Sequence, residues 1–318
     1  MKRVDIFFLM VSLFLFVGGC SWRELGLFYG NHVLEKQETL RPVDEDISLI
    51  ITDEKKADEY GIIEFKGLDQ TELLLHQLTE QNKPLVILVH GKGKLEVKGF
   101  DPKVIWRVES TYGVKVLTFH WPSYDPIGYK VWPQLNAKAT APYLIQFFEK
   151  LEKIKIKEKA QHPVTLVFNS MGARVLMHTL EGKNDSTPCA EKPLYFSQMV
   201  DRVLLSGAEA PSNDHEDWLQ CIDAETWVTI NQGDMMLAAV ESLRSSPRLG
   251  NDIKVFQKNS IGKQFHFLDL SPVEGGNHDY ALGESTLPTI EYFKDFYRGL
   301  PQNGLESMEN GNFSLLSK

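Results

Sequence analysis

Ser170 stands where a short apolar run gives way to a helical pattern. The run at 164–168 is followed by N-S-M-G-A-R at 169–174. A serine on a sharp turn between a strand and a helix exposes its hydroxyl above the sheet, and the amide of the next residue, Met171, points at the same space. One group is a nucleophile and the other stabilises a developing oxyanion. The segment therefore predicts acyl-transfer chemistry at Ser170.

A second turn with functional potential follows the apolar run at 85–89, where positions 90–93 read H-G-K-G. A phosphate-binding loop is excluded because G-x-x-x-x-G-K-[ST] is absent. With the Ser170 turn, this segment resembles the α/β-hydrolase superfamily, in which a strand followed by His-Gly supplies an oxyanion-hole amide. The resemblance covers about 84–299.

The resemblance implies roles for four residues around the oxyanion. The backbone amide of Met171 is joined by that of Gly91 or Lys92 to form the oxyanion hole. His90 is expected to be structural and to hold this loop.

The resemblance also implies an acid after a later strand and a histidine after the last one. The run at 227–230 is followed by N-Q-G-D, ending in Asp234, and the run at 265–270 by a glycine-containing loop with His278. The order Ser170, Asp234, His278 is the order of the family. Carried over, Ser170 is the nucleophile, His278 the general base and then acid, and Asp234 orients the imidazole.

Two features leave alternatives open. Glu209 follows the strand at 200–205 and is a rival for Asp234, because some hydrolases place the acid one strand earlier. Phe168 stands where the usual G-x-S-x-G motif has a small residue. It motivates a second hypothesis, a catalytically inactive hydrolase-fold lipoprotein that serves as an envelope binding or assembly protein.

The expected activity is that of a serine hydrolase working through an acyl-enzyme. The first substrate class is an ester, either a small molecule or a lipid, and thioesters and amides follow. No H-E-x-x-H or paired-carboxylate pattern occurs, so the reaction requires no metal or other cofactor. We expect the protein to be a monomer.

The turns that carry this chemistry need a sheet to position them. Short apolar runs at 85–89, 114–119, 164–168, 200–205, 227–230 and 265–270 alternate with helix-sized stretches, most clearly 137–154 and 285–299. This alternation predicts a parallel sheet covered on both faces. The expected fold class is α/β, the three-layer α/β-hydrolase fold with a mostly parallel central sheet.

The rest of the chain is divided by pattern. Residues 20–83 are expected to be an N-terminal tether with early strands at 47–51 and 61–65 and a helix at 70–79. The catalytic domain spans 84–300. The polar, Asn/Gly/Ser-rich segment 301–318 is expected to be a flexible tail.

The first residues predict a sorting signal. Lys2 and Arg3 precede an apolar run at 6–17, which is shorter than the ~20 residues of a membrane-spanning helix and fits a secretory signal peptide. Positions 17–20 read V-G-G-C and resemble a bacterial lipobox. The resemblance implies that residues 1–19 are removed and that Cys20 carries a lipid such as palmitate. The expected location is the bacterial cell envelope, lipid-anchored in the membrane. Ser21, where inner-membrane retention signals have Asp, favours the outer membrane of a Gram-negative host.

Composition and cysteine count set further limits. The 318 residues are 42% hydrophobic and 24% charged, with 34 basic and 43 acidic side chains and a net charge of -9. This globular, acidic composition argues against nucleic acid as a partner. With Cys20 lipidated, Cys189 and Cys221 remain as an even pair in an oxidising compartment. Sequence leaves open whether they form a disulfide or two separate thiols.

Overall fold

The structure is a computed structural model in which one mostly parallel sheet organises the chain. The described residues are 43–93, 100–123, 132–181, 189, 194–258, 262–302, 304–307 and 312–315. The predicted signal peptide and Cys20 lie outside them. Within these ranges no helix combines the length and the apolar character needed to cross a membrane.

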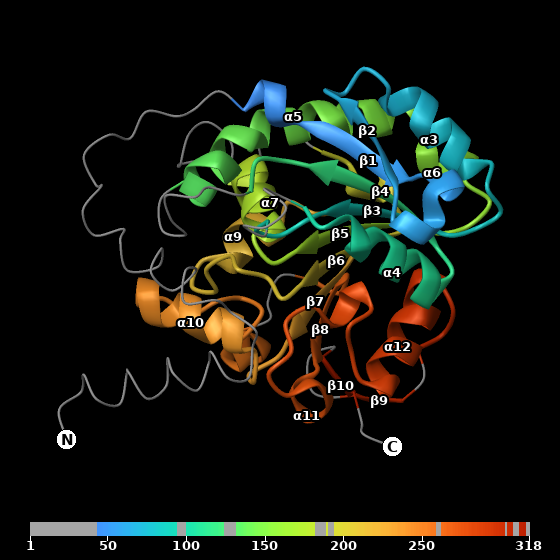
Figure 1. Ribbon diagram of the computed structural model, residues 1–318. Helices are drawn as coiled ribbons and strands as arrows, with labels where there is room; N and C mark the ends of the chain where they lie inside the picture. The colour runs from blue at the N-terminus through green and yellow to red at the C-terminus, as the bar shows by residue number, and fades with distance from the viewer. Residues whose placement is uncertain are drawn as a thin grey trace.

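The sheet has ten strands in the order β2-β1-β4-β3-β5-β6-β7-β8-β10-β9 (Figure 1). The run from β4 to β10 is parallel, whereas β1 is antiparallel to both of its neighbours and β9 is antiparallel to β10. The strands are β1 (Ser48–Thr52), β2 (Ile62–Lys66), β3 (Leu85–Val89), β4 (Lys115–His120), β5 (Val164–Asn169), β6 (Arg202–Ser206), β7 (Glu225–Ile230), β8 (Phe265–Asp269), β9 (Leu305–Ser307) and β10 (Phe313–Leu315).

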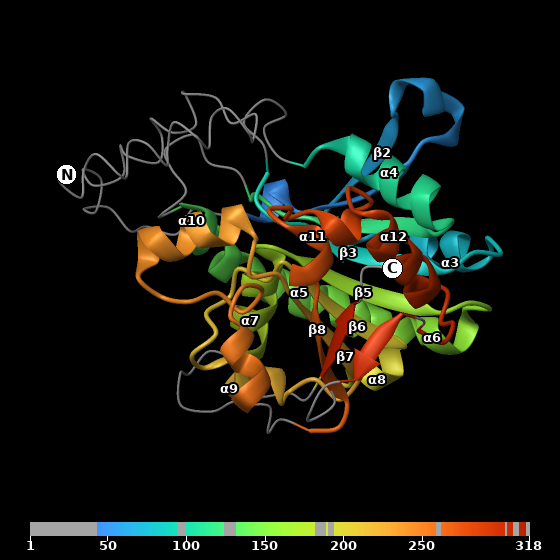
Figure 2. The same ribbon diagram turned by 90° about the horizontal axis from the view of Figure 1, so that it is seen from below.

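Helices cover both faces of this sheet. The α-helices are α3 (Thr71–Thr79), α4 (Pro102–Tyr112), α5 (Trp132–Ile154), α6 (Ile156–Lys159), α7 (Gly172–Glu181), α8 (Phe196–Met199), α9 (His215–Leu219), α10 (Met235–Arg244), α11 (Ser271–Glu274) and α12 (Leu287–Tyr297). Short 3-10 turns are η2 (Asp44–Asp46), η3 (Glu54–Glu59), η4 (Ile253–Lys258) and η5 (Tyr280–Leu282). Figure 2 shows α4, α11 and α12 on one side of the sheet and α7, α8 and α9 on the other.

The central strands are apolar throughout because both of their faces are covered. In β3 all five residues are buried. Leu85, Ile87 and Val89 belong to the core beneath α5 and α7, whereas Val86 and Leu88 belong to the core beneath α4 and α12. The expected three-layer, mostly parallel α/β fold is confirmed.

Two strands begin at charged residues, so their boundaries differ from those of the apolar runs in the sequence. The strand expected at 200–205 begins at Arg202, and the one expected at 227–230 begins at Glu225. These two residues are register partners on neighbouring strands, and Arg202 Nε lies 3.1 Å from a Glu225 carboxylate oxygen. The main-chain ladder continues through this ion pair, which hydrophobicity alone does not reveal.

Strands on both sides of the expected catalytic domain, 84–300, also belong to the sheet. Residues 48–52 form β1, which pairs with β4 inside the sheet. The segment from 301 is not a loose tail in its described part, because β10 pairs with β8 and β9 pairs with β10. Phe313 of β10 stacks on Trp227 with ring centroids 5.4 Å apart. Sheet pairing and this aromatic contact hold a segment that its polar composition suggested was free.

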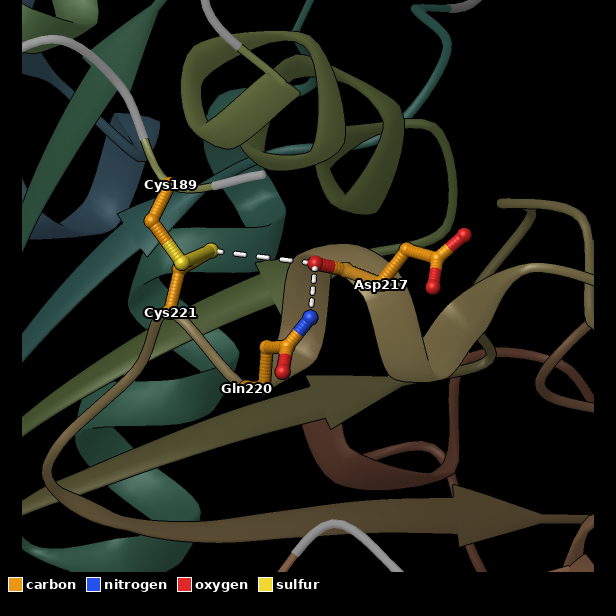
Figure 3. The surroundings of a disulfide bond; sticks show 4 residues. All are labelled: Cys189, Asp217, Gln220 and Cys221. Atoms are coloured by element: carbon orange, nitrogen blue, oxygen red, sulfur yellow. Dashed lines mark hydrogen bonds between the residues drawn. A yellow bond between two sulfur atoms is a disulfide. The ribbon is translucent and has the colours of Figure 1, made fainter. Parts of the chain in front are cut away.

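A disulfide joins Cys189 to Cys221, just beyond α9 (Figure 3). Their Cα atoms are 5.0 Å apart and their sequence separation is 32. The α9 side of the bridge is ordered by Gln220, whose side-chain amide donates to the Asp217 carbonyl at 3.0 Å. The bridge therefore ties the chain near 189 to the end of a helix next to the sheet.

We predict that replacing both cysteines, Cys189→Ser with Cys221→Ser, lowers the free energy of unfolding by roughly 3–4 kcal/mol, because closing a loop of this length restricts the unfolded chain. Urea unfolding of both proteins measures the difference. A reducing agent should bring the wild type to the stability of the variant and leave the variant unchanged. Equal stability of the two oxidised proteins would contradict the prediction.

Candidate active site

Ser170 occupies a strained turn between β5 and α7. Its φ is +52°, in the left-handed region that residues with a Cβ adopt only when their surroundings enforce it. Both of its main-chain groups are held. Its N–H donates to the Ser206 carbonyl at 2.9 Å, and its carbonyl accepts from the Glu209 N–H at 3.1 Å. The end of β6 and the chain after it therefore hold this conformation, in which Ser170 is partly exposed.

The two flanks of this turn have opposite size requirements. A Cβ at Gly172 would lie 2.3 Å from the Val89 carbonyl oxygen, so the start of α7 passes β3 at a distance only glycine allows. Phe168 is fully buried and packs edge-on against Phe148 of α5, with ring centroids 6.5 Å apart. The large residue is thus accommodated in the core beneath α5, and the sharp turn forms despite it.

The loop after β3 lies directly against the serine. A Cβ at Gly91 would be 2.7 Å from the Cβ of Ser170. Within the described part of the chain, no acceptor takes the backbone N–H of Gly91 or of Met171. Lys92, the other candidate donor, has an exposed side chain. Two backbone amide donors next to the nucleophile are the groups that an oxyanion hole requires.

His90 holds this loop through both of its ring nitrogens. Nδ1 lies 2.7 Å from the Gly91 carbonyl oxygen and must carry the proton, since a carbonyl only accepts. Nε2 then accepts from the Trp121 N–H at 3.3 Å and from Nδ1 of His120 at 3.0 Å. Burial holds the pKa of His90 well below its usual range, and the neighbouring His120 lowers it further. The hydrogen bond to Gly91 has a smaller, opposite effect. A neutral His90 therefore anchors the Gly91 turn.

Asp234 and His278 form a hydrogen-bonded pair. Asp234 Oδ2 lies 2.6 Å from His278 Nδ1. The other carboxylate oxygen accepts from the Leu237 N–H at 3.0 Å and so caps the N-terminus of α10. Asp234 has no exposed surface, while 15% of the His278 side chain is exposed. The helix N-terminus favours the negative charge, and the bond to Nδ1 leaves Nε2 of His278 for other partners.

Opposing effects set the proton affinity of His278. Burial is the largest effect and lowers its pKa. The charge and hydrogen bond of Asp234 oppose it, with smaller contributions from Asp279 and Glu209, and together they raise the pKa to about 9. The surroundings thus favour the imidazolium, which is the form a general base reaches when it accepts a proton.

The serine and the histidine lie against the same turn. Ser206 accepts the backbone hydrogen bond of Ser170. The next residue, Gly207, has φ +53°, and a Cβ on it would lie 3.0 Å from Cε1 of His278. Residues from the ends of β5 and β7 and from the loop after β8 therefore converge at one edge of the sheet.

Glu209, the rival acid, has other partners. Its side chain is fully buried and its carboxylate is hydrogen-bonded to Arg174 of α7. Arg244 Nε and Arg248 Nη1 lie 3.8 and 4.0 Å from its second oxygen. The structure thus places Glu209 in an arginine cluster and Asp234 on the imidazole.

Three residues near this site have no motif that marks them in the sequence. Arg174 binds Glu209, and Asn231 bridges two loops of the site. The Tyr280 hydroxyl accepts from the Gly207 N–H at 2.8 Å. Asn231 and Tyr280 lie within three residues of Asp234 and His278, the one signal that could have singled them out. Among the described residues, no three His, Cys, Asp or Glu side chains group as a metal site would need.

Comparisons with known proteins give structural neighbours only. No family model matches the sequence, and no curated protein does. A cold-adapted esterase from an Arctic intertidal metagenomic library has a TM-score of 0.40 at 13% identity over 67% of this chain and 82% of that one. Carboxyl esterase 2 from Tuber melanosporum has a TM-score of 0.36 at 14% identity, over 68% of this chain and 78% of that one. A putative hydrolase from Agrobacterium vitis has a TM-score of 0.35 at 12% identity, over 81% of this chain and 99% of that one.

We predict that Asp234→Asn lowers the pKa of His278 from about 9 to below 6.5, because burial then acts with little opposition. Glu209→Gln should lower it much less, since Glu209 is the smallest of the acidic contributions. NMR titration of the imidazole Cε1–H measures both. Larger shifts in Glu209→Gln than in Asp234→Asn would reverse the assignment of the acid.

The same pair makes stability depend on pH with a defined sign. Because the pKa of His278 is higher in the folded protein than the usual 6.5, protonation of His278 favours folding. This contribution to the free energy of unfolding is complete below pH 6.5 and is lost as the pH rises toward about 9. Asp234→Asn should remove this part of the alkaline decline in urea unfolding.

Proposed function

We propose that the protein is a serine hydrolase that cleaves carboxylic esters through an acyl-enzyme. The observation that carries the proposal is the hydrogen bond between Asp234 and His278 Nδ1, which leaves Nε2 of the imidazole as a base beside the turn that holds Ser170. An acid that fixes the imidazole, a histidine that accepts a proton and a serine in a strained exposed turn are the parts of a catalytic triad.

The arrangement of these groups supports acylation of the serine followed by deacylation. His278 takes the hydroxyl proton of Ser170 as the serine oxygen adds to the ester carbonyl, and Asp234 stabilises the imidazolium. The amides of Met171 and Gly91 hold the oxyanion. The intermediate collapses, and the leaving alkoxide receives the proton from His278. His278 then takes a proton from water as the water oxygen adds to the acyl carbonyl, and it returns that proton to the serine oxygen as the carboxylic acid leaves.

The electrostatics of His278 favour alkaline conditions for this reaction. Only the neutral imidazole accepts the serine proton, and its fraction grows as the pH rises toward the pKa of about 9. The charge of Asp234 thus makes His278 a stronger base and at the same time reduces the neutral fraction at pH 7.

The position of Phe168 argues against the inactive alternative that this residue motivated. Its ring lies in the core against Phe148, while Ser170 keeps its left-handed conformation and both main-chain hydrogen bonds. A large residue two positions before the serine is therefore compatible with the exposed turn. We propose an active enzyme.

We also propose that the enzyme works at the bacterial cell envelope, anchored through lipidated Cys20. The support is the sequence pattern, in which basic residues, the apolar run at 6–17 and V-G-G-C occur in the order of a lipoprotein signal. The disulfide between Cys189 and Cys221 suits an oxidising compartment outside the cytosol. A lipid anchor would bring the site to ester substrates in or near a membrane.

We predict that Ser170→Ala abolishes hydrolysis of p-nitrophenyl esters and leaves the melting temperature nearly unchanged, because the turn exposes the serine. A fluorophosphonate probe should label Ser170 in the wild type and nothing in the variant. Hydrolysis at the wild-type rate by a folded Ser170→Ala protein would refute the assignment of the nucleophile.

Glu209→Gln is the matched control, because Glu209 is a buried carboxylate near the same site that does not bind His278. It should retain activity within about tenfold, whereas Asp234→Asn should reduce turnover by several orders of magnitude.

We predict that Cys20→Ser prevents lipidation and moves the protein from the membrane fraction to the soluble fraction. Growth with an alkynyl fatty acid, followed by coupling to a fluorophore, detects the modification. Ser21→Ala serves as the control and should remain labelled. Fatty-acid incorporation in Cys20→Ser, or none in the wild type, would rule out the lipid anchor at this residue.

A further inference from the structure

The acid and the base of the site come from two loops that extend beyond the neighbouring strands β7 and β8. Asp234 follows β7, and His278 lies between α11 and η5. We propose that Asn231 is a positioning residue that sets the placement of His278 relative to Asp234. This inference rests on the proposed function, in which that pair activates Ser170.

The side chain of Asn231 bonds to both loops at once. Its Nδ2 donates to the Asn277 carbonyl at 2.8 Å, next to His278. Its Oδ1 accepts from the Gly233 N–H at 3.1 Å, next to Asp234. One rigid amide therefore spans the neighbours of the acid and the base.

The main chain of Asn231 extends the connection to the nucleophile turn. Its carbonyl accepts from the Asp234 N–H at 3.0 Å, and its N–H donates to the Gly250 carbonyl at 2.9 Å. Gly250 in turn donates to the Ala208 carbonyl at 2.9 Å. Ala208 follows Gly207, the residue against which His278 packs. All three loops of the site are thus linked through Asn231.

The two loops also touch where neither has a side chain. A Cβ at Gly233 would lie 2.2 Å from the Gly275 carbonyl oxygen and 2.8 Å from its carbon. These backbones pass at a distance that excludes any side chain at Gly233. The contact limits how close the loops come, and the Asn231 amide keeps them from separating.

Asn231 is suited to this role because it has no exposed surface and its side chain and main chain are both bonded. Removing the amide leaves the Asn277 carbonyl, at a half-buried position, and the N–H of the exposed Gly233 without these partners. Water can then bond to both groups, which favours separation of the loops. Small shifts of this kind weaken a catalytic hydrogen bond disproportionately.

Asn231→Ala tests the proposal without substrate. The bond from Asp234 is one of the effects that raise the pKa of His278 to about 9, and loosening it should lower that value by one unit or more in an NMR titration of the imidazole Cε1–H. Asn136→Ala is the matched control. Asn136 is 1% exposed and its Nδ2 donates to the Pro122 carbonyl at 2.7 Å. The control substitution therefore removes an equally buried amide elsewhere and should leave the pKa of His278 unchanged.

Gly233→Ala provides a second variant that moves the loops from the other side, since its new methyl group meets the Gly275 backbone. It should lower the pKa of His278 as well, and it serves if Asn231→Ala does not fold. A purely structural role would lower the melting temperature in both variants with the pKa unchanged, and that result would overturn the proposal.

Ester assays on the same proteins should show kcat reduced about 10- to 100-fold with KM changed less than threefold. Failure of the proposed function is separately visible, because the wild type would then neither hydrolyse esters nor react with a fluorophosphonate at Ser170, whatever the titration shows. An unaltered pKa of His278 in a wild type that does react would count against Asn231 alone.

Discussion

The carboxylate of Asp234 has no exposed surface, and a buried charge is tolerated only where every part of it has a partner. One oxygen caps α10 and the other binds His278, so the acid is fixed by a helix and is committed to the imidazole. This pairing raises the proton affinity of the base against the effect of its burial. The turn at Gly233, the contact with Gly275 and the Asn231 bridge all maintain it.

The sheet makes this pairing feasible because its central strands are parallel. Their carboxyl ends lie at one edge, which is where Ser170, Asp234 and the loop of His278 emerge. The left-handed conformation of Ser170 has an energetic cost, and it is held by the hydrogen bond that Ser170 donates to Ser206 and the one that it accepts from Glu209. Glu209 is therefore connected to the site through its main chain, while its carboxylate serves the arginine cluster.

Much of the fold was predictable because buried parallel strands are apolar on both faces. The run at 85–89 agrees with β3, whereas β6 and β7 begin at the charged partners Arg202 and Glu225, which an apolar criterion does not include. The strands at 305–307 and 313–315 were missed for a related reason. The second pairs with β8, the first pairs with the second, and Phe313 stacks on Trp227, none of which is a local property.

The candidate nucleophile, the order of the three candidate residues and the alternation of strands with helices could all be predicted from the sequence, since they depend on local residue types and their succession. Only the tertiary structure shows which of the two carboxylates bonds to Nδ1 of His278, because Asp234 and Glu209 both follow a strand. The pairing of Cys189 with Cys221 and the role of Asn231 likewise required the fold. Both depend on distances between segments far apart in the chain, and spacing along the sequence does not encode such distances.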